Sequence, residues 1–381
     1  MIRPVILLKN FINLNGAPVN AETAYPSQKL PSASLLLLRK SPSRLLLSVF
    51  LLYNLLGLAV LVVAGRYPTS LYVRNALFSK VVDDTEITDE AALNREIARS
   101  FRRDPPRFDP RSLFTTSELQ RLDRYVDASR HARCRVASDH PLTRLTPADC
   151  LARRLAEDVS PYQQGGKCGL DGSLRARIGQ VHHGVGCCSD YNEAFLMRAQ
   201  AVGLQAREVH NMGHTMAEYF DPAEKRWKWI DTSKRVQIAN WDGRLVSAYQ
   251  RRVRLPWTSL RFVDLPPMTT KKDVEPASGF VGYLATSNSI LFWTRGVNFQ
   301  QQEALEAPLR RLGLPREFVQ MLSLSLGVRP GWLVLAPPEA AFRFRLSAFL
   351  LWSSLLIFVR VDAGLLAGAL GWRLSRERPF R

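Results

Sequence analysis

The residues with the clearest chemical potential lie at 186–190 (GCCSD), where a glycine-rich loop gives way to a predicted helix. A thiol becomes a strong nucleophile only as its thiolate, which the positive end of a helix dipole and free backbone N–H groups stabilise. The same N–H groups can bind the oxyanion that forms when a carbonyl is attacked. A cysteine in the first turn of this helix is therefore well placed to attack an acyl group.

Such a thiol needs a base within hydrogen-bond reach and a third group that orients the base. The pattern predicts strands over 204–211, 213–220 and 227–231. His214 lies at the start of the second strand, and Asp231 ends the third. If these strands are neighbours, the two side chains can act as base and orienting carboxylate.

These residues occur in a characteristic order. Gly-x-Cys-x-Asp-Tyr opens the helix, Gly-Leu-Gln-Ala-Arg follows it, and Gly-His and Trp-x-x-x-Asp come next. This order resembles the core of the transglutaminase-like superfamily, and by position the resemblance assigns Cys188 as nucleophile, His214 as base and Asp231 as orienting acid. It also implies a papain-like α+β fold, in which the helix that bears the cysteine packs on an antiparallel sheet. Because family members include peptidases, amidases, acyl transferases and inactive proteins, the resemblance leaves the reaction open.

Several positions depart from the family pattern, although none of the departures removes a catalytic group. The Met216 side chain replaces a tryptophan and alters the wall beside His214, which leaves substrate preference open. Three other departures occur. Asn192 and Glu193 stand where the family has alanine and a small residue, Gln205 stands where it has proline, and Thr232-Ser233 stand where it has Pro-Thr.

Cys187 and His210 are the nearest competitors for these roles. The Gly-x-Cys-x-Asp spacing favours Cys188, and His210 is interpreted as a half-exposed histidine at a strand end. The cysteines and histidines between 182 and 214 include no Cys-x-x-Cys pair and no His-Glu-x-x-His motif, and adjacent cysteines make poor joint ligands. We therefore expect neither a metal nor another cofactor.

Setting Cys188 aside leaves Cys134, Cys150, Cys168 and Cys187. Four cysteines allow two disulfides in three connectivities, and an external compartment would permit them. A Cys134–Cys150 bridge between two upstream helices is one interpretation, and four buried free thiols are the other. Both interpretations stay open at this stage.

Two apolar segments predict membrane association. Residues 45–64 carry no charge and are long enough to cross the roughly 30 Å hydrocarbon layer of a bilayer. A signal peptide is the rival interpretation, but this run is too long and lies too far from Met1. The second segment, 343–372, has arginines at both ends of its apolar run and predicts a transmembrane or interfacial helix. A helical hairpin over 346–372 is the alternative.

The predicted organisation follows from these segments. The fold class is α+β, with the papain-like domain between two transmembrane helices. The predicted parts are a basic arm over 1–44, a transmembrane helix over 45–65, a connector over 66–112, a transglutaminase-like domain over 113–265, an extension of unclear fold over 266–340 and the second helix over 343–372.

Charge predicts the orientation in the membrane. Residues 1–44 hold six basic residues against one acid, and 373–381 hold four arginines against one acid. Short basic segments beside membrane helices favour the cytoplasmic side. We therefore expect a location in the inner (cytoplasmic) membrane, with both termini cytoplasmic and the catalytic domain facing the periplasm or exterior.

The formal net charge of +18 comes largely from arginine. No nucleic-acid-binding signature accompanies it, so a nucleic acid partner is not expected, whereas an anionic glycan stays an alternative. The sequence predicts a membrane-anchored cysteine enzyme that acts on a peptide or protein amide through a thioester, with the lipid bilayer and other envelope proteins as partners. The alternative is a non-catalytic, membrane-anchored binding or scaffold protein of an envelope assembly.

Overall fold

The structure is a computed structural model, and it describes only part of the chain. The described residues are 47–57, 75–100, 109–131, 142, 145–159, 173–211, 214–254, 260–265, 290–294, 299–329 and 331–376.

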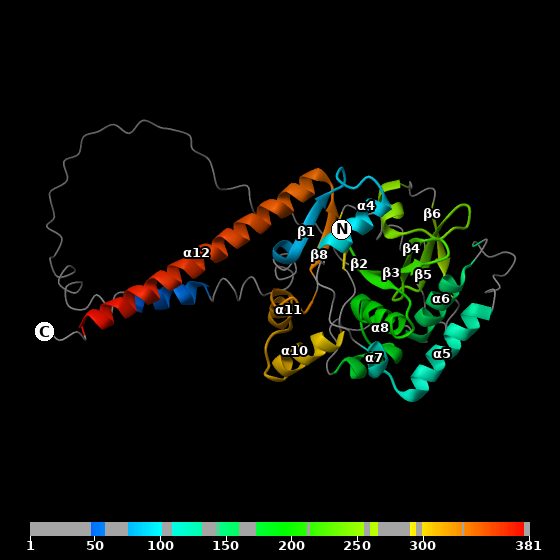
Figure 1. Ribbon diagram of the computed structural model, residues 1–381, viewed down its shortest axis with the longest axis horizontal. Coiled ribbons are helices and arrows are strands. Elements are labelled where there is room, and N and C mark those ends of the chain that lie inside the picture. The colour runs from blue at the N-terminus through cyan, green and yellow to red at the C-terminus, as the bar shows by residue number, and fades with distance from the viewer. Residues whose placement is uncertain are drawn as a thin grey trace, which may run out of the picture. The chain divides into compact units, whose positions relative to one another are not determined.

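The described strands form one sheet (Figure 1), with strand order β1-β8-β7-β2-β3-β4-β5-β6. The paired strands are antiparallel except for β1 and β8, which run parallel. The strands are β1 (Ser79–Asp83), β2 (Ala206–His210), β3 (Thr215–Asp221), β4 (Arg226–Asp231), β5 (Val236–Asn240), β6 (Leu260–Asp264), β7 (Leu291–Trp293) and β8 (Trp332–Ala336).

The α+β class is confirmed, but the expectation of a purely antiparallel sheet is wrong. Antiparallel neighbours can be joined by short turns, whereas parallel neighbours need a long crossover connection. β1 and β8 stand at opposite ends of the domain sequence, so the rest of the domain provides that connection. Segments predicted as connector and extension thus contribute strands to the same sheet as the candidate site.

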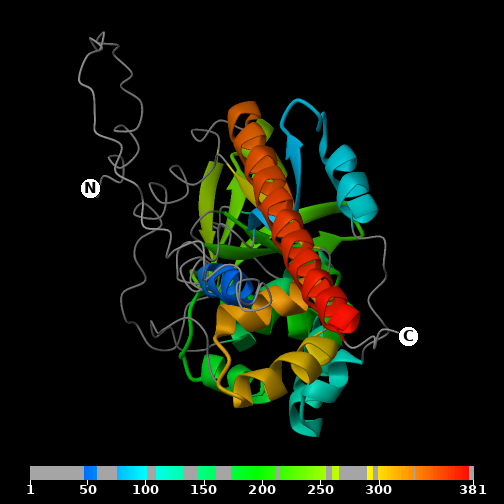
Figure 2. The same ribbon diagram turned by 90° about the vertical axis from the view of Figure 1, so that its left-hand side faces the viewer.

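Helices cover both faces of the sheet (Figures 1 and 2). One face packs against α5, α6, α7 and α8, and the other packs against α4. The helices are α4 (Glu90–Ser100), α5 (Thr116–His131), α6 (Pro147–Val159), α7 (Leu174–His182), α8 (Cys188–Ala201), α10 (Phe299–Arg311), α11 (Arg316–Ser325) and α12 (Pro338–Arg376), with short η1 (Pro110–Leu113) and η2 (Gln250–Arg254).

Strand β3 shows how alternation builds the two layers. Successive side chains of a strand point to opposite faces. Ala217 and Tyr219 accordingly pack in the core with α8, whereas Met216 packs with Trp229 in the core on the α4 side. Met216 is fully buried, and its Sδ accepts a hydrogen bond from Trp229 Nε1 at 3.2 Å.

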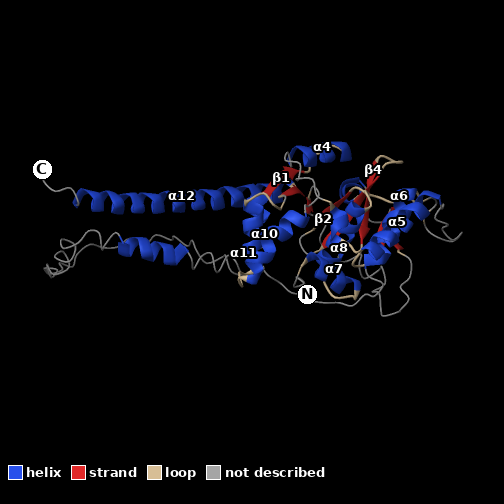
Figure 3. Cartoon of the chain, turned by 60° about the horizontal axis from the view of Figure 1, so that its bottom comes forward, coloured by secondary structure: helices blue, strands red, loops and turns tan. Residues whose placement is uncertain are grey.

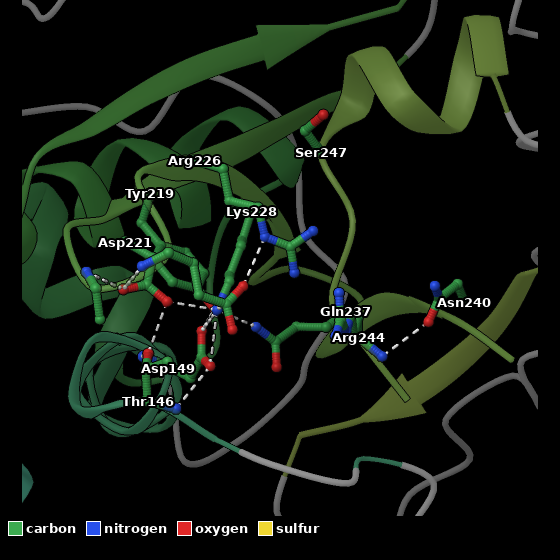
Figure 4. Close-up of polar contacts among 12 residues, drawn as sticks. Thr146, Asp149, Tyr219, Asp221, Arg226, Lys228, Gln237, Asn240, Arg244 and Ser247 are labelled. Carbon is green, nitrogen blue, oxygen red and sulfur yellow. Dashed lines mark hydrogen bonds and ion pairs between the residues drawn. The ribbon is translucent and has the colours of Figure 1, made fainter. Parts of the chain in front are cut away.

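A buried polar network joins α6 to this sheet (Figure 4). Lys228 Nζ lies 2.8 and 2.9 Å from the two carboxylate oxygens of Asp149 and 2.5 Å from Asp221 Oδ2. Tyr219 donates to Asp149 at 2.7 Å, and Thr146 donates to Asp221 at 2.8 Å. The charges in this network are paired and hydrogen-bonded, as burial requires.

Within the described residues, one helical segment is long and apolar enough to cross a membrane. It covers Pro338–Gly368 of α12 (Figure 3). Because α12 continues unbroken to Arg376, a hairpin over 346–372 is excluded. The predicted first span is described as a helix only over Leu47–Gly57, and the rest of it lies outside the described residues. The structure therefore provides one candidate span, not two.

The chain divides into two compact units, 1–54 with 362–381 and 55–361. In the first unit, Asn54 Nδ2 donates to Asp362 Oδ1 at 2.9 Å. In the second, a Cβ added to Gly57 would lie 2.4 Å from the Phe358 ring, so the ring approaches where only glycine leaves room.

Candidate active site

Cys188 is the first residue of α8. The chain enters the helix through Gly186, whose φ of 135° favours glycine, and Cys187 is the N-cap residue. The Asp190 carboxylate accepts a hydrogen bond from the Cys187 N–H at 3.0 Å, which satisfies a backbone donor and places a negative charge at the positive end of the helix. The core face of α8, which includes the fully buried Phe195, holds the helix against the sheet.

Strands β3 and β4 bring His214 and Asp231 together. They pair antiparallel with Ala217 opposite Ile230, so the start of one meets the end of the other. His214 Nε2 lies 2.5 Å from Asp231 Oδ2. Asn211 fixes the backbone before β3, because its Oδ1 accepts from the His214 N–H at 2.8 Å.

The second oxygen of Asp231 is also satisfied. Oδ1 accepts from Ser233 Oγ at 2.8 Å and from the Lys234 N–H at 2.9 Å. Burial raises the pKa of Asp231, but the charge of His214 and these donors outweigh burial and hold the pKa below its ordinary value. The carboxylate is therefore fixed and ionised beside the imidazole.

Cys188 is half-buried and forms a hydrogen bond with His214. Because Nε2 of His214 faces Asp231, Nδ1 is the ring nitrogen left for the thiol. Burial lowers the pKa of His214, but Asp231 and Cys188 outweigh it and raise the pKa to about 10. Burial raises the pKa of Cys188, but hydrogen bonds and charge from His214 and the hydrogen bond from the Thr215 N–H outweigh burial. The pKa of Cys188 is therefore below its ordinary value. The arrangement favours a thiolate–imidazolium pair.

Asn192 is a buried residue that the sequence reasoning did not assign to the site. Its Nδ2 donates to the Cys188 carbonyl at 2.8 Å and to the Thr215 carbonyl at 2.7 Å. Its Oδ1 accepts from Thr232 Oγ1 at 3.1 Å. One side chain thus joins α8, the start of β3 and the chain just after β4. The signal in the sequence was its position four residues after Cys188, on the same helix face.

Arg251 is a second residue near the site that the sequence did not indicate, and it is charged. Its guanidinium lies over the Trp229 ring, 5.8 Å from the centroid, and its side chain is fully buried. Burial lowers the pKa of Arg251 to about 10, while the charge of Asp231 acts in the opposite direction. Arg251 therefore adds a positive charge to the surroundings of Asp231.

The competing residues occupy other environments. Cys187 is disulfide-bonded, whereas Cys188 is free. His210 ends β2, where Nδ1 lies 3.1 Å from Thr215 Oγ1 and Nε2 lies 3.1 Å from Glu208 Oε1. Its ring packs edge-on against Trp332. His210 therefore lies beside the site but pairs with a different carboxylate.

Cys150 is disulfide-bonded as well, so the interpretation with four free thiols is wrong. The proposed Cys134–Cys150 pairing involves a residue outside the described part of the chain, as would any pairing with Cys168. No group of three or more His, Cys, Asp or Glu residues within the described ranges could hold a metal ion.

Comparisons with known proteins provide no family assignment. No protein-family model and no curated protein match the chain. Among solved structures, the chain is similar to one in "Crystal structure of Rad4-Rad23 bound to a 6-4 photoproduct UV lesion", with 10% identity and a TM-score of 0.23. The match covers 69% of this chain and 57% of that one. A similarity this weak supports no argument about fold or function.

Proposed function

We propose that this protein is a membrane-anchored, transglutaminase-like cysteine enzyme that attacks amide or related acyl bonds through Cys188. The observation that carries the proposal is the contact series from the Cys188 thiol through His214 to Asp231. Three separate elements, α8, β3 and β4, contribute these groups or adjoin them, and nucleophilic catalysis by a thiol needs such a series of nucleophile, base and orienting acid. The order of the motifs in the sequence supports the same assignment.

The proposed reaction starts from a Cys188 thiolate beside a protonated His214. The Cys188 thiolate attacks the acyl carbon, and a sulfur–carbon bond forms. First-turn N–H groups of α8 provide donors for the resulting oxyanion. The carbon–nitrogen bond then breaks, His214 gives its proton to the leaving amine, and a thioester stays on Cys188. Asp231 holds the imidazole in position throughout.

A second nucleophile then resolves the thioester. Water gives the acid and makes the protein a peptidase or amidase, whereas an amine gives a new amide and makes it a transglutaminase. In both cases His214 takes the proton of the incoming nucleophile, and the Cys188 thiolate leaves. The substrate class is a peptide or protein amide.

The proposed location is the inner membrane, with the enzymatic domain on the periplasmic or outer side. The apolar length of α12 supports a membrane anchor, and the basic residues at both ends of the chain support cytoplasmic termini. The polar Asn54–Asp362 contact also fits paired membrane helices, since polar side chains in a bilayer need partners.

A thiol-directed acyl probe tests the proposed function. The full-length protein in detergent should form one covalent adduct, which peptide mass spectrometry should locate on Cys188. The Cys188→Ala variant should form none. A folded wild-type protein that never forms the adduct would contradict the proposal and favour a non-catalytic scaffold of an envelope assembly.

A further inference from the structure

We infer that a cluster of arginines and glutamates, which includes a residue of the helix that bears Cys188, binds a carboxylate group of the substrate. The cluster consists of Arg177, Glu193, Glu306, Arg310 and Arg329, which come from α7, α8, α10 and the turn after α11. The term substrate rests on the proposed function, whereas the binding of a carboxylate does not.

Arg177 has an open hydrogen-bonding edge. Its side chain is 6% exposed, and one terminal nitrogen, Nη1, donates to Glu193 Oε2 at 3.0 Å. The other two nitrogens, Nε and Nη2, are buried and have no hydrogen-bond partner in the described part of the chain. This edge of a guanidinium is a fork that matches the two oxygens of a carboxylate.

Arg310 presents a second open donor. Its Nη2 lies 3.2 Å from Glu306 Oε2, while its Nε is buried and lacks a partner among the described residues. Burial lowers the pKa of Arg310, and the positive charge of Arg177 lowers it further. Two arginines with unused N–H groups therefore lie close enough to repel each other.

The glutamates of the cluster are already engaged. Glu193 accepts from Arg177, and Glu306 accepts from Arg310 at 3.2 Å and from Arg329 at 2.6 Å. A buried donor without a partner costs about 1–3 kcal/mol. An added carboxylate would satisfy the open edge of Arg177 and reduce its repulsion with Arg310. The buried donors without partners, together with one arginine in excess over the glutamates, make this a site for an anion.

The cluster shares helix α8 with the nucleophile. Glu193 follows Cys188 by five residues on α8, a rise of about 7.5 Å along the helix. Burial lowers the pKa of Arg329, but Glu306, and to a smaller extent Glu193 and Glu208, outweigh burial and raise it. Glu208 also contacts His210 at the edge of the site.

The ligand is thus an acidic peptide, whose carboxylate can come from a side chain or from a free C-terminus. Three peptides separate these sources: acetyl-Ala-Glu-Ala-amide, the glutamine analogue acetyl-Ala-Gln-Ala-amide, and acetyl-Ala-Gln-Ala with a free carboxylate. Their affinities should be measured by calorimetry on the full-length Cys188→Ala protein in detergent at fixed ionic strength. This variant makes the result independent of the chemical step.

We expect at least one carboxylate peptide to bind more than about tenfold tighter than the neutral one, as for a buried charge pair. Arg310→Gln should abolish this preference, and Arg177→Lys should weaken it, because lysine lacks the fork. The exposed neighbours Arg311→Gln and Arg175→Gln are matched controls and should preserve it.

Equal affinity for all three peptides would overturn the inference. So would an unchanged preference in both the Arg310→Gln and Arg177→Lys proteins, each first shown to be folded by circular dichroism. A missing acyl adduct would instead count against the proposed function and would leave the binding result intact.

Discussion

The charge balance between Cys188 and His214 controls the reactivity of the candidate site. Asp231 raises the pKa of His214 to about 10, and protonated His214 lowers the pKa of Cys188. The raised pKa of His214 stabilises the fold fully below its unfolded value of about 6.5, and this contribution is lost as pH rises through about 10. The lowered pKa of Asp231 stabilises the fold at higher pH, and that contribution is lost as pH falls through the folded value.

Replacing Asp231 by asparagine tests this balance. Asp231→Asn removes the negative charge, so the pKa of His214 should fall and the ion pair should weaken. We expect the rate of acyl-probe labelling at pH 7 to fall by about 10²-fold or more, the range for a positioned acid–base group. Asp242→Asn, at an exposed turn, is the control and should label at the wild-type rate. Equal rates for both variants would contradict the role of Asp231.

Replacing Asn192 tests a positioning role. Asn192→Ala leaves the half-buried carbonyl of Cys188 and the buried carbonyl of Thr215 without their side-chain donor. At about 1–3 kcal/mol for each unsatisfied group, urea denaturation should show a loss of about 2–4 kcal/mol in unfolding free energy. Labelling of the folded protein should slow as well, and the pH dependence of labelling should shift. An effect on stability alone would make Asn192 merely structural.

Residue types and spacing indicated that Cys188, His214 and Asp231 could meet, and the resemblance to the transglutaminase-like superfamily assigned the roles that stay a prediction. The structure brings Cys188, His214 and Asp231 together. Their positions at a helix start and at strand ends could be predicted, because such ends can be recognised from local sequence. Asn192 and Arg251 were missed because their roles depend on contacts across elements. The spacing of four residues could have linked Asn192 to Cys188 within α8, but nothing in the local sequence indicates that Asn192 also reaches Thr215 in β3.

At the scale of elements, the α6–sheet network fixes the helical layer that also contains α8. Strand pairing explains why the mixed sheet was missed. The β1–β8 pair joins segments at opposite ends of the domain, and alternation within one strand carries no information about such a distant partner.

Lys228→Met tests the network. The substitution leaves the buried carboxylates of Asp149 and Asp221 without their shared cation. Loss of one partner from a buried ion pair costs about 3–5 kcal/mol, so the melting temperature and unfolding free energy should fall accordingly. Lys225→Met, in the exposed turn before β4, should leave both unchanged. A wild-type stability for Lys228→Met would show that the network contributes little.

At the scale of the whole molecule, the chain is basic and contains one described helix, α12, that is apolar enough to cross a membrane. Labelling of Cys188 can show on which side of that membrane the domain lies. Sequence length and hydropathy were sufficient to predict α12. They left the choice between one helix and a hairpin open, because Arg360 and Asp362 divide the segment into two apolar stretches. The continuous helix resolves that choice.

Labelling in intact cells tests the proposed orientation. A membrane-impermeant thiol reagent should modify Cys188 without permeabilisation if the domain faces the periplasm or exterior. The Cys188→Ala protein is the control for modification elsewhere. Labelling that requires disruption of the cytoplasmic membrane would contradict this orientation.

The most direct test of the central claim is the rate of Cys188 alkylation by iodoacetamide as a function of pH. For the wild-type protein we expect a rate that is nearly constant between about pH 7 and 9, because His214 already holds the thiolate. For His214→Gln we expect a lower rate at pH 7 that rises with pH, as for a free thiol with a pKa of about 8.5. A wild-type rate that rises with pH as the variant's does would contradict the Cys188–His214 ion pair and the proposed mechanism.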